Sequence, residues 1–420
     1  MNLSQWTERI DGLNLHDMEL GLSRMRRVWE RLSTGRLATT VFSVAGTNGK
    51  GTCAHFLERA FRAQGSRTGL YTSPHLLRFN ERVRLHGRPV DDDTLCAAFE
   101  QVEMARQSET LTFFEFTTLA ALRIFADAEL DVVVLEVGLG GRLDAVNVVD
   151  ADVAIVTRIG IDHTQYLGDT RAAIAREKAG IFRSGRPAIV ADPEPPPTLA
   201  QYAQEVEATL FQRGDHFRCG AISDTEFEWA CDARTLSALP RPFGMPLTSF
   251  AAALMALHCV DALPDAVTLR PLLRDWQLEG RLQWQPGAPN VLLDVAHNPQ
   301  AAALLARRLA AIEGPKRVIV GMLADKDAGA FAKALMANAD HWHAVGVDGP
   351  RGQPAQALAE QLAAAGVTNV CVSESVAGAL AIERARAGAR DTLVVCGSFH
   401  VVGPALAWLG LYSRCKIVKN

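Results

Sequence analysis

Lysine is scarce in this chain of 420 residues, in which arginine and lysine together number 43 and only seven are lysines. Residues 1–300 contain two of them, Lys50 and Lys178. Arginine therefore supplies most of the positive charge. A retained lysine indicates a task that needs a primary amine, because a guanidinium differs from it in shape and is always charged. Both lysines become candidate functional residues.

Other features are also missing, and each absence excludes a class of protein. No apolar run approaches the roughly 20 residues that span a bilayer, so we expect no membrane partner. The polar stretch of residues 1–10 does not match a signal peptide. The net charge is −4 and no basic stripe stands out, so we expect no nucleic-acid partner. The eight cysteines are scattered without a C-x-x-C pair, which favours reduced thiols in a cytoplasmic protein.

Residues 44–52, Val-Ala-Gly-Thr-Asn-Gly-Lys-Gly-Thr, have the composition of a phosphate-binding loop. A predicted strand, Thr39–Val44, precedes the loop and a predicted helix, Cys53–Gln64, follows it, which is the context that the motif requires. Glycines let backbone N–H groups turn toward a polyphosphate, and the helix N-terminus adds its positive dipole end. Lys50 would reach the β- and γ-phosphates, with Thr52 near a magnesium ion. In the usual pattern Ser or Thr follows the lysine directly, whereas Gly51 intervenes here; a chance glycine-rich turn is the alternative.

Strand-like apolar runs alternate with helical segments along the chain, which is typical of a parallel α/β sheet. A second alternating pattern begins near Val291 and continues to Cys396. Length also favours at least two domains. We therefore predict an α/β fold with a P-loop-type parallel-sheet ATPase domain over residues 1–284. A smaller doubly wound, Rossmann-like domain is predicted over residues 285–420.

Three further loops follow predicted strands and carry polar side chains. Ser73 lies in the first, Glu136 ends a buried strand before a glycine-rich turn, and His163 lies in the third. Magnesium prefers hard oxygen ligands, which Ser73, Glu136 and Thr52 offer, whereas His163 is a softer ligand. Each alone fits a helix cap or a satisfied polar residue. Their coincidence at strand ends, where parallel sheets bind ligands, indicates a phosphate and metal site.

Two other interpretations stay open from the residues alone. Lys178 fits a carbamylated, metal-binding lysine, but it also fits an exposed helix position beside Glu177. In the second pattern, Asp294 and Asn298 flank a strand-to-helix junction, and both residue types favour helix N-caps. Capping and ligand binding can coexist, because the same helix end attracts anions.

Taken together, these segments resemble the folate branch of the Mur ligase superfamily, the folylpolyglutamate synthases and dihydrofolate synthases. The matching segments are residues 46–52, 71–75, 135–144, 162–163, 177–180, 280–281, 294–299 and 397–398. Residues 112–115 resemble a stretch that helps to bind dihydropteroate in the bacterial bifunctional type. Residues 19–22 match a second, weaker part of that pterin site.

The resemblance implies an ATP-dependent amide ligase. A carboxylate attacks the γ-phosphate of ATP and becomes an acyl phosphate, which the amino group of L-glutamate then attacks. The implied substrates are dihydropteroate, reduced folates and L-glutamate. The implied cofactors are ATP, two Mg²⁺ ions and a carbamylated Lys178, in a cytoplasmic monomer. Closure of two domains would exclude water from the acyl phosphate.

The resemblance also implies a role for individual residues. It assigns catalysis to Lys50, Lys178, His297 and Ser398. It assigns ATP binding to Gly49, Lys50, Gly51, Thr52, Ser249, Arg281 and Asp294. Metal binding falls to Thr52, Ser73, Glu136, His163 and Lys178, with Ser73 and Glu136 on one ion and His163 on the second. Pterin binding falls to Glu19, Leu20, Gly21, Leu22, Thr112, Phe113, Phe114, Glu115, Leu143, Asp144 and Ala145.

One position departs from the pattern. Where bacterial relatives open a helix with an asparagine that contacts ATP, this chain has Ser249, followed by Phe250. A hydroxyl offers fewer hydrogen-bond donors and acceptors than the carbonyl and NH₂ of an amide, so the residue at this position bears on nucleotide affinity. Two rival functions remain from the residues alone: a P-loop kinase or switch NTPase, and a nucleotide-binding regulator descended from a ligase. The inserted Gly51 and the second α/β unit oppose the first, and the intact Lys50 and Glu136 oppose the second.

Overall fold

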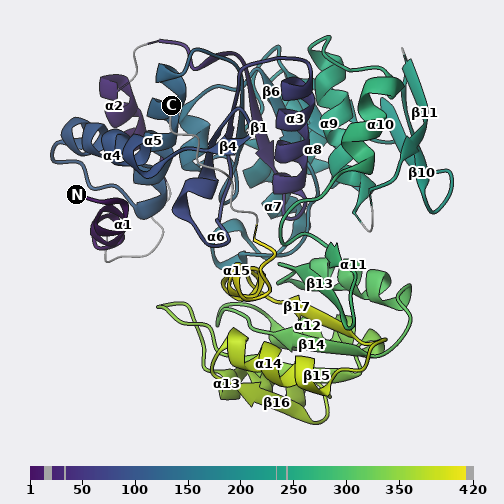
Figure 1. Cartoon of the computed structure of the whole chain (residues 1–420). Coiled ribbons are helices and arrows are strands. Elements are labelled where there is room, and N and C mark those ends of the chain that lie inside the picture. The colour runs from purple at the N-terminus through teal and green to yellow at the C-terminus, as the bar shows by residue number, and fades with distance from the viewer. Residues whose placement is uncertain (14–20, 33–34, 233, 243–244, 413–420) are drawn as a thin grey trace. The chain divides into compact units, whose positions relative to one another are not determined.

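The computed structural model describes residues 1–13, 21–32, 35–232, 234–242 and 245–412 (Figure 1). They form two compact units, the first made of Met1–Arg241 and Pro246–Asp275 and the second beginning at Trp276. The predicted domains, residues 1–284 and 285–420, and the functions assigned to them remain predictions. Among the described residues, no helix has the length and apolar character needed to cross a membrane.

The first unit is built on an eight-stranded sheet in the order β4-β3-β2-β5-β1-β6-β7-β8. Its strands are β1 (Ala38–Ala45), β2 (Thr68–Tyr71), β3 (Val83–Leu85), β4 (Arg88–Pro89), β5 (Leu130–Glu136), β6 (Val153–Val156), β7 (Pro187–Val190) and β8 (Thr209–Gln212). The six strands from β2 to β8 in this order pair in parallel, and the β3–β4 hairpin is antiparallel at one edge.

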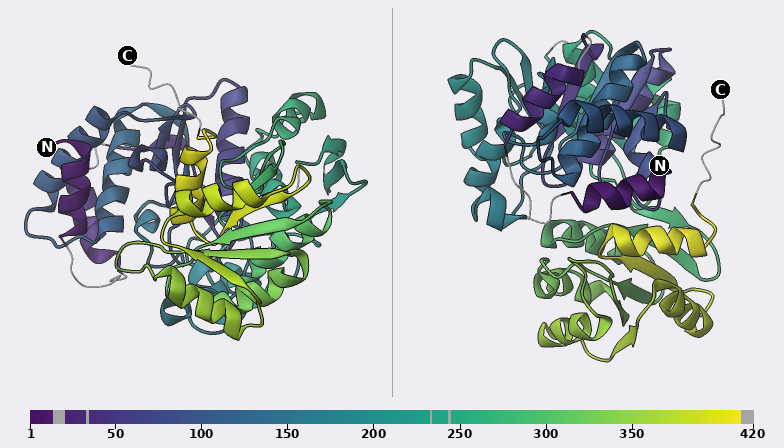
Figure 2. Two further views of the ribbon diagram at one scale, coloured as in Figure 1. Left: turned by 60° about the horizontal axis from the view of Figure 1, so that its bottom comes forward. Right: turned by 90° about the vertical axis from the view of Figure 1, so that its left-hand side faces the viewer.

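Helices cover both faces of this sheet (Figures 1 and 2). They are α1 (Leu3–Asp11), α2 (Ser23–Leu32), α3 (Lys50–Ala63), α4 (Asp92–Arg106), α5 (Phe113–Asp127), α6 (Thr164–Leu167), α7 (Arg171–Ala179) and α8 (Thr198–Glu205), with the 3₁₀ turns η1 (Phe79–Arg82) and η2 (Ala145–Val148). Phe42 of β1 packs on Phe61 of α3, with ring centroids 5.4 Å apart. Its neighbour Val41 instead joins the core formed with α1, α2, α4 and α5, because successive strand residues face opposite sides.

The rest of the first unit is a small antiparallel sheet with two helices. It comprises β9 (Phe217–Ala221), β10 (Glu226–Cys231), β11 (Arg234–Pro240), α9 (Leu247–Cys259) and α10 (Ala266–Arg274). Helix α9 is buried over most of its length and packs against α3, β6 and β7.

The second unit is a six-stranded sheet in the order β12-β13-β17-β14-β15-β16, in which only the β12–β13 pair is antiparallel. Its strands are β12 (Gln283–Gln285), β13 (Asn290–Asp294), β14 (Lys316–Val320), β15 (His341–Val345), β16 (Val370–Ser373) and β17 (Thr392–Cys396). Its helices are α11 (Pro299–Ala310), α12 (Ala328–Leu335), α13 (Ala355–Ala364), α14 (Val376–Arg386) and α15 (Phe399–Trp408), with the 3₁₀ turn η3 (Met336–Asn338). Helices α11, α12 and α13 pack in series, and α14 packs on α15. The predicted α/β class, with a second and smaller parallel sheet, is confirmed.

Candidate functional site

Four neighbouring strands of the first sheet, in the order β2-β5-β1-β6, end at the same edge. The register pairs Tyr71 with Leu135, Val44 with Glu136 and Ala45 with Val156. The structure therefore brings together the Ser73 loop, Glu136, the phosphate loop and the Asp162–His163 loop. The sequence had linked these segments by their position after strands and by the family resemblance.

At two positions the phosphate loop has a backbone conformation that requires glycine. Gly46 has φ 145° and Gly49 has φ 91°. A Cβ atom on Gly46 would lie 2.0 Å from Oγ1 of Thr157, a hydroxyl that donates to the carbonyl of Asn48 at 2.9 Å. Helix α3 begins directly at Lys50, so its first backbone N–H groups open toward the loop. The Lys50 amine donates to the Gly46 carbonyl at 3.0 Å, and the segment fits a triphosphate.

Hard oxygen donors flank this loop. The backbone N–H of Ser73 donates to Oε2 of Glu136 at 3.2 Å, so the two predicted magnesium ligands touch. Glu136 and Thr52 are both buried. Carboxylate and hydroxyl oxygens are the donors that Mg²⁺ prefers, so this set fits a magnesium ion.

Lys178 is buried in the last turn of α7, so the interpretation as an exposed helix residue is wrong. Burial, and next the charge of Lys50, lower the pKa of the Lys178 amine to about 7, while Asp162 and Asp144 oppose the shift. Lys178 therefore lies among the residues that the sequence had marked as phosphate and metal ligands. An amine with such a pKa is neutral in a large fraction of molecules near pH 7, and the neutral form is the one that reacts with carbon dioxide.

The glycine-rich turn after Glu136 packs directly on the end of α7. A Cβ atom on Gly141 would lie 2.9 Å from the carbonyl oxygens of Glu177 and Lys178. One on Gly180 would lie 2.3 Å from Cβ of Arg142. The turn and the helix end thus fit together only because both glycines lack side chains.

The loop after β6 is held by a buried carboxylate that sequence analysis did not single out. Asp192 accepts from the backbone N–H of Ile159 at 2.7 Å and pairs with Arg171 at 3.2 Å. His163 has φ 53° and precedes α6, and its backbone N–H donates to Oδ1 of Asp162 at 2.9 Å. Only the spacing of Asp192 behind a strand could have pointed to it.

The predicted pterin residues have structural partners of their own. Thr112 and Glu115 form a capping box at the start of α5, and Glu115 also pairs with Arg24 at 2.8 Å. Asp144 is buried and accepts from the N–H groups of Leu139 and Val146, and burial raises its pKa to about 6.

The remaining members of this set are Gly21, Leu22, Phe113, Phe114, Leu143 and Ala145, of which Gly21 and Leu22 lie just before α2 and Ala145 begins η2. Glu19 and Leu20 lie outside the described residues.

Ser249 contacts the phosphate loop itself. Its hydroxyl donates to the Gly49 carbonyl at 3.0 Å, and the side chain is buried. Phe250 is fully buried and packs edge-on against Phe56 of α3, with ring centroids 5.1 Å apart. Phe250 is therefore a core residue that holds α9 on α3.

The predicted residues of the second unit gather at the carboxyl ends of β13 and β17, which pair in parallel. Asp294 accepts from the N–H groups of Leu282 and Ala296, and burial raises its pKa. Arg281 lies over the ring of Phe399 at 4.7 Å from its centroid. The other two assigned positions have local bonds: Nδ1 of His297 lies 2.8 Å from the Val295 carbonyl, and Ser398 caps α15.

Sequence analysis missed Arg82, which ends η1 and is buried. Its Nε donates to Nδ1 of His75 at 2.9 Å, and its guanidinium lies over the rings of Phe79 and Phe113. An arginine-rich chain gives no reason to select one arginine, so only its spacing after the Ser73 loop could have pointed to it.

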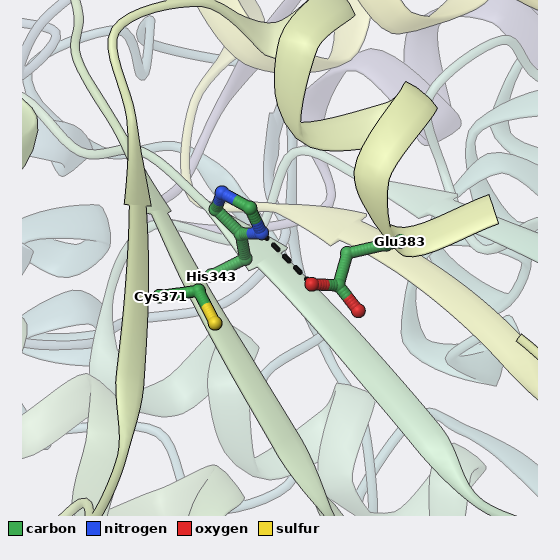
Figure 3. Close-up of side chains that lie close together, drawn as sticks. All are labelled: His343, Cys371 and Glu383. Atoms are coloured by element: carbon green, nitrogen blue, oxygen red, sulfur yellow. Dashed lines mark hydrogen bonds and ion pairs between the residues drawn. The ribbon is translucent and has the colours of Figure 1, made fainter. Parts of the chain in front are cut away.

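A cluster of His343, Cys371 and Glu383 lies in the second unit, away from these strand ends, with ligand atoms within 4.8 Å of one another (Figure 3). Two guanidinium groups already occupy it. Arg317 pairs with Glu383 at 3.1 Å, and Arg386 donates to Sγ of Cys371 at 3.4 Å. The positive charge of both arginines opposes a metal cation, so the cluster is a buried ion-pair network.

Comparisons with known proteins agree with this geometry. The family model of the Mur ligase middle domain matches residues 44–215, and that of the Mur ligase glutamate ligase domain matches residues 280–399. The dihydrofolate synthase/folylpolyglutamate synthase of Escherichia coli (strain K12) is 45% identical over 404 residues, covering 95% of this chain and 94% of the relative. The Haemophilus influenzae protein of the same name is 37% identical over 422 residues, covering 95% and 96%.

Solved structures agree in fold. E. coli FolC in complex with DHPP and ADP superposes with a TM-score of 0.93 at 43% identity, covering 98% of each chain. A bifunctional folylpolyglutamate synthase/dihydrofolate synthase with Mn, AMPPNP and L-glutamate bound superposes with a TM-score of 0.91 at 43% identity, covering 98% of each chain.

Proposed function

The chain belongs to the dihydrofolate synthase/folylpolyglutamate synthase family of Mur ligases, which are ATP-dependent ligases, and we propose that it joins L-glutamate to dihydropteroate and to folate glutamyl chains. The observation that supports this most directly is the meeting of Ser73, Glu136 and the phosphate loop at one sheet edge. That edge supplies the donors for a nucleotide and a divalent metal together. A substrate carboxylate placed there can accept a phosphoryl group.

The reaction has two steps in this proposal. A carboxylate oxygen of the pterin acid attacks the γ-phosphorus of ATP, and ADP leaves. The amino nitrogen of L-glutamate then attacks the acyl carbon, loses a proton, and expels inorganic phosphate as the amide bond forms. Lys50 and the N–H groups at the start of α3 stabilise the negative charge on the transferred phosphoryl group.

Ser73, Glu136 and Thr52 are the proposed ligands of a first magnesium ion, and His163 of a second. A bound Mg²⁺ neutralises phosphate charge and orients the phosphoryl group for in-line attack. The short contact between Ser73 and Glu136 presets this donor pair, because the backbone N–H fixes one carboxylate oxygen. Buried Thr52, in the first turn of α3, adds a hydroxyl oxygen on the side of the phosphate loop.

Carbamylation of Lys178 is also part of the proposal. The neutral amine attacks carbon dioxide, a proton leaves, and the carbamate anion replaces a buried cation beside Lys50. Burial and the charge of Lys50 disfavour the ammonium form and so favour the neutral, reactive amine, and Lys50 also attracts the carbamate anion once it has formed. It would then serve as an oxygen ligand for the second metal ion.

The second unit contributes nucleotide and amino-acid contacts in this proposal. Asp294 and Arg281 are the proposed ATP contacts, and His297 and Ser398 lie by assignment near the acyl phosphate and the incoming glutamate. Asp294 ends β13 and Ser398 follows the neighbouring parallel strand β17, and the carboxyl ends of such strands are where α/β sheets bind ligands. We propose that the protein acts in the cytoplasm as a monomer without nucleic-acid partners.

The decisive assay measures ADP formation by the purified protein with ATP and Mg²⁺. We expect ADP only when L-glutamate and either dihydropteroate or tetrahydrofolate are both present. ADP formation with neither acid would favour the alternative of a P-loop kinase or switch NTPase. Tight ATP binding without turnover under every condition would favour a nucleotide-binding regulator.

A further inference from the structure

Arg82 is a buried cation at the edge of the sheet that carries the candidate site. It directly precedes β3, which runs antiparallel to β2 with Val83 opposite Tyr71. The backbone N–H of Thr72 donates to the Arg82 carbonyl at 2.9 Å, so Arg82 is fixed beside the residue that precedes Ser73. Arg82 therefore lies at the same strand ends as the predicted metal ligands, on the side away from the phosphate loop.

The hydrogen-bond partners of this guanidinium are neutral. Nε donates to Nδ1 of His75, and the Tyr71 hydroxyl lies beside the group. A guanidinium carries more N–H donors than these two groups can accept. Within the described part of the chain, no carboxylate lies within ion-pair distance of Arg82, and Glu81 and Glu136 act on it only through longer-range charge.

A buried guanidinium without a carboxylate partner lowers the free energy of unfolding unless an anion binds to it. A buried charge is usually paired, because its lost hydration must be replaced. Burial accordingly lowers the pKa of Arg82. Glu81, the adjacent carboxylate, instead accepts three backbone N–H groups, from Leu76, Leu77 and Arg78.

Aromatic rings flank the cation and indicate the kind of anion. Arg82 lies 5.4 Å from the ring centroid of Phe79 and 5.6 Å from that of Phe113. Phe113 belongs to the segment assigned to pterin binding, and aromatic faces suit the planar rings of a pteroate. Phosphate groups already have Lys50 and the start of α3 as partners, and β2 and β5 lie between that loop and β3.

We propose that Arg82 binds the carboxylate of the pterin acid and orients it for attack on the γ-phosphate, an assignment that rests on the proposed function. The guanidinium pairs with the carboxylate through charge-assisted hydrogen bonds, which are strong and directional. Nε stays on His75, so the Ser73–His75 loop that carries a metal ligand also sets the angle of the guanidinium. Arg82 thus couples carboxylate binding to the metal site.

The test compares dihydropteroate with its carboxamide, which keeps the rings and lacks the charge. Affinities of both ligands are measured by calorimetry on the full chain, for the wild type, Arg82→Met, Arg82→Lys and the control Arg88→Met. Arg88 is an exposed arginine on the adjoining strand β4. We expect the wild type and Arg88→Met to prefer the acid by about 10- to 100-fold.

Arg82→Met should lose this preference and leave carboxamide binding unchanged, and Arg82→Lys should keep part of it. The midpoint of thermal unfolding without ligand should not fall in Arg82→Met, because the variant removes a buried charge that has no carboxylate in ion-pair contact among the described residues. A wild-type preference in Arg82→Met would overturn the inference. If Arg82→Met does not fold, the test uses Arg82→Lys. The inference would be overturned if Arg82→Lys prefers the acid over the carboxamide as strongly as the wild type and has an altered KM for L-glutamate.

These outcomes are separate from those for the proposed function. A wild type that binds dihydropteroate in an Arg82-dependent way but forms no ADP with L-glutamate would refute the ligase proposal alone. A wild type that forms the amide while Arg82→Met keeps the acid preference would refute the Arg82 inference alone. A KM for L-glutamate that rises in Arg82→Met, with the acid preference intact, would assign Arg82 to the amino acid instead.

Discussion

The Ser249 hydroxyl donates a 3.0 Å hydrogen bond to the carbonyl oxygen of Gly49, the left-handed residue that precedes α3. A residue 200 positions away in sequence thus fixes the phosphate loop. A Cβ atom on Gly49 would lie 2.5 Å from this hydroxyl, so the two residues are in close contact. Ser249 holds the shape of the loop through its backbone.

Ser249→Ala should therefore loosen the phosphate loop. The variant removes one of the two donors to the Gly49 carbonyl and leaves the N–H of Cys53, and the lost hydrogen bond costs about 1 kcal/mol of folding free energy. We expect a higher KM for ATP and a smaller change in kcat, because the loop still folds when nucleotide binds. Steady-state kinetics with varied ATP, together with a denaturant titration, check both effects.

Ser249→Asn separates two views of the same position. The family resemblance implies that the asparagine amide contacts ATP, which would lower the KM for ATP in this variant by an amount worth about 1 kcal/mol. The packing of Ser249 against Gly49 predicts the opposite, a higher KM, because the larger side chain displaces the loop. Measuring the KM for ATP at saturating pterin acid and L-glutamate decides between them.

Lys50→Ala should abolish nearly all ligase activity while the fold survives. The amine is the main side-chain cation of the loop, and its removal should cost about 3 kcal/mol or more of transition-state stabilisation. Lys333→Ala, at an exposed position on α12, is the matched control. Wild-type turnover in Lys50→Ala, with ADP formation as the readout, would refute the assignment of the phosphate loop.

Lys178 should carry a carbamate in the active protein. Carbon-13 NMR of protein equilibrated with labelled bicarbonate should show one carbamate signal, absent in Lys178→Arg. The neutral amine reacts, so the signal and the activity should fall as pH drops below about 7, where the amine protonates. Full activity in carbonate-free buffer with an unmodified Lys178 would contradict this prediction.

The same lysine makes stability depend on pH in carbonate-free buffer. Its pKa is 10.5 in the unfolded reference and about 7 in the folded protein. Between these values the unfolded state binds more protons, so this group makes the free energy of unfolding rise with pH. Lys178→Met should remove that slope and be more stable than the wild type near pH 7, a difference that shrinks toward pH 10.5. Chemical denaturation at several pH values measures it.

Glu115→Ala should lower stability more than substrate turnover. Glu115 belongs to the capping box of α5 and pairs with Arg24, both largely buried, so removing the carboxylate takes an ion-pair partner from Arg24 and an acceptor from the Thr112 N–H. The expected loss is about 2 kcal/mol or more in the free energy of unfolding. Glu100→Ala in α4, which is exposed, provides the control. A loss of pterin affinity without a loss of stability would instead support the assignment of Glu115 to the substrate.

The strands and helices were largely predictable, because apolar runs and capping residues determine them locally. Lys50 could be chosen from its loop, and Lys178 from its rarity. The burial of Lys178 could not, since the glycine-rich turn that packs on its backbone belongs to a distant segment. Arg82 and Asp192 had no local signal beyond their spacing after a loop and a strand. Their positions arise from strand pairing, antiparallel between β2 and β3 for Arg82 and parallel between β6 and β7 for Asp192, and no single stretch of sequence specifies that pairing.

The contact between the glycine-rich turn and the end of α7 has an evolutionary consequence. Gly141 packs against the backbone at Lys178, and Gly180 packs against Arg142, so the shapes of the two segments are complementary. Substitutions in one should be tolerated only when the other changes with it. A chimera that takes residues 138–144 from a distant homologue but keeps residues 174–181 should misplace the Lys178 amine. Among members of the family, substitutions in these two segments are therefore expected to occur together.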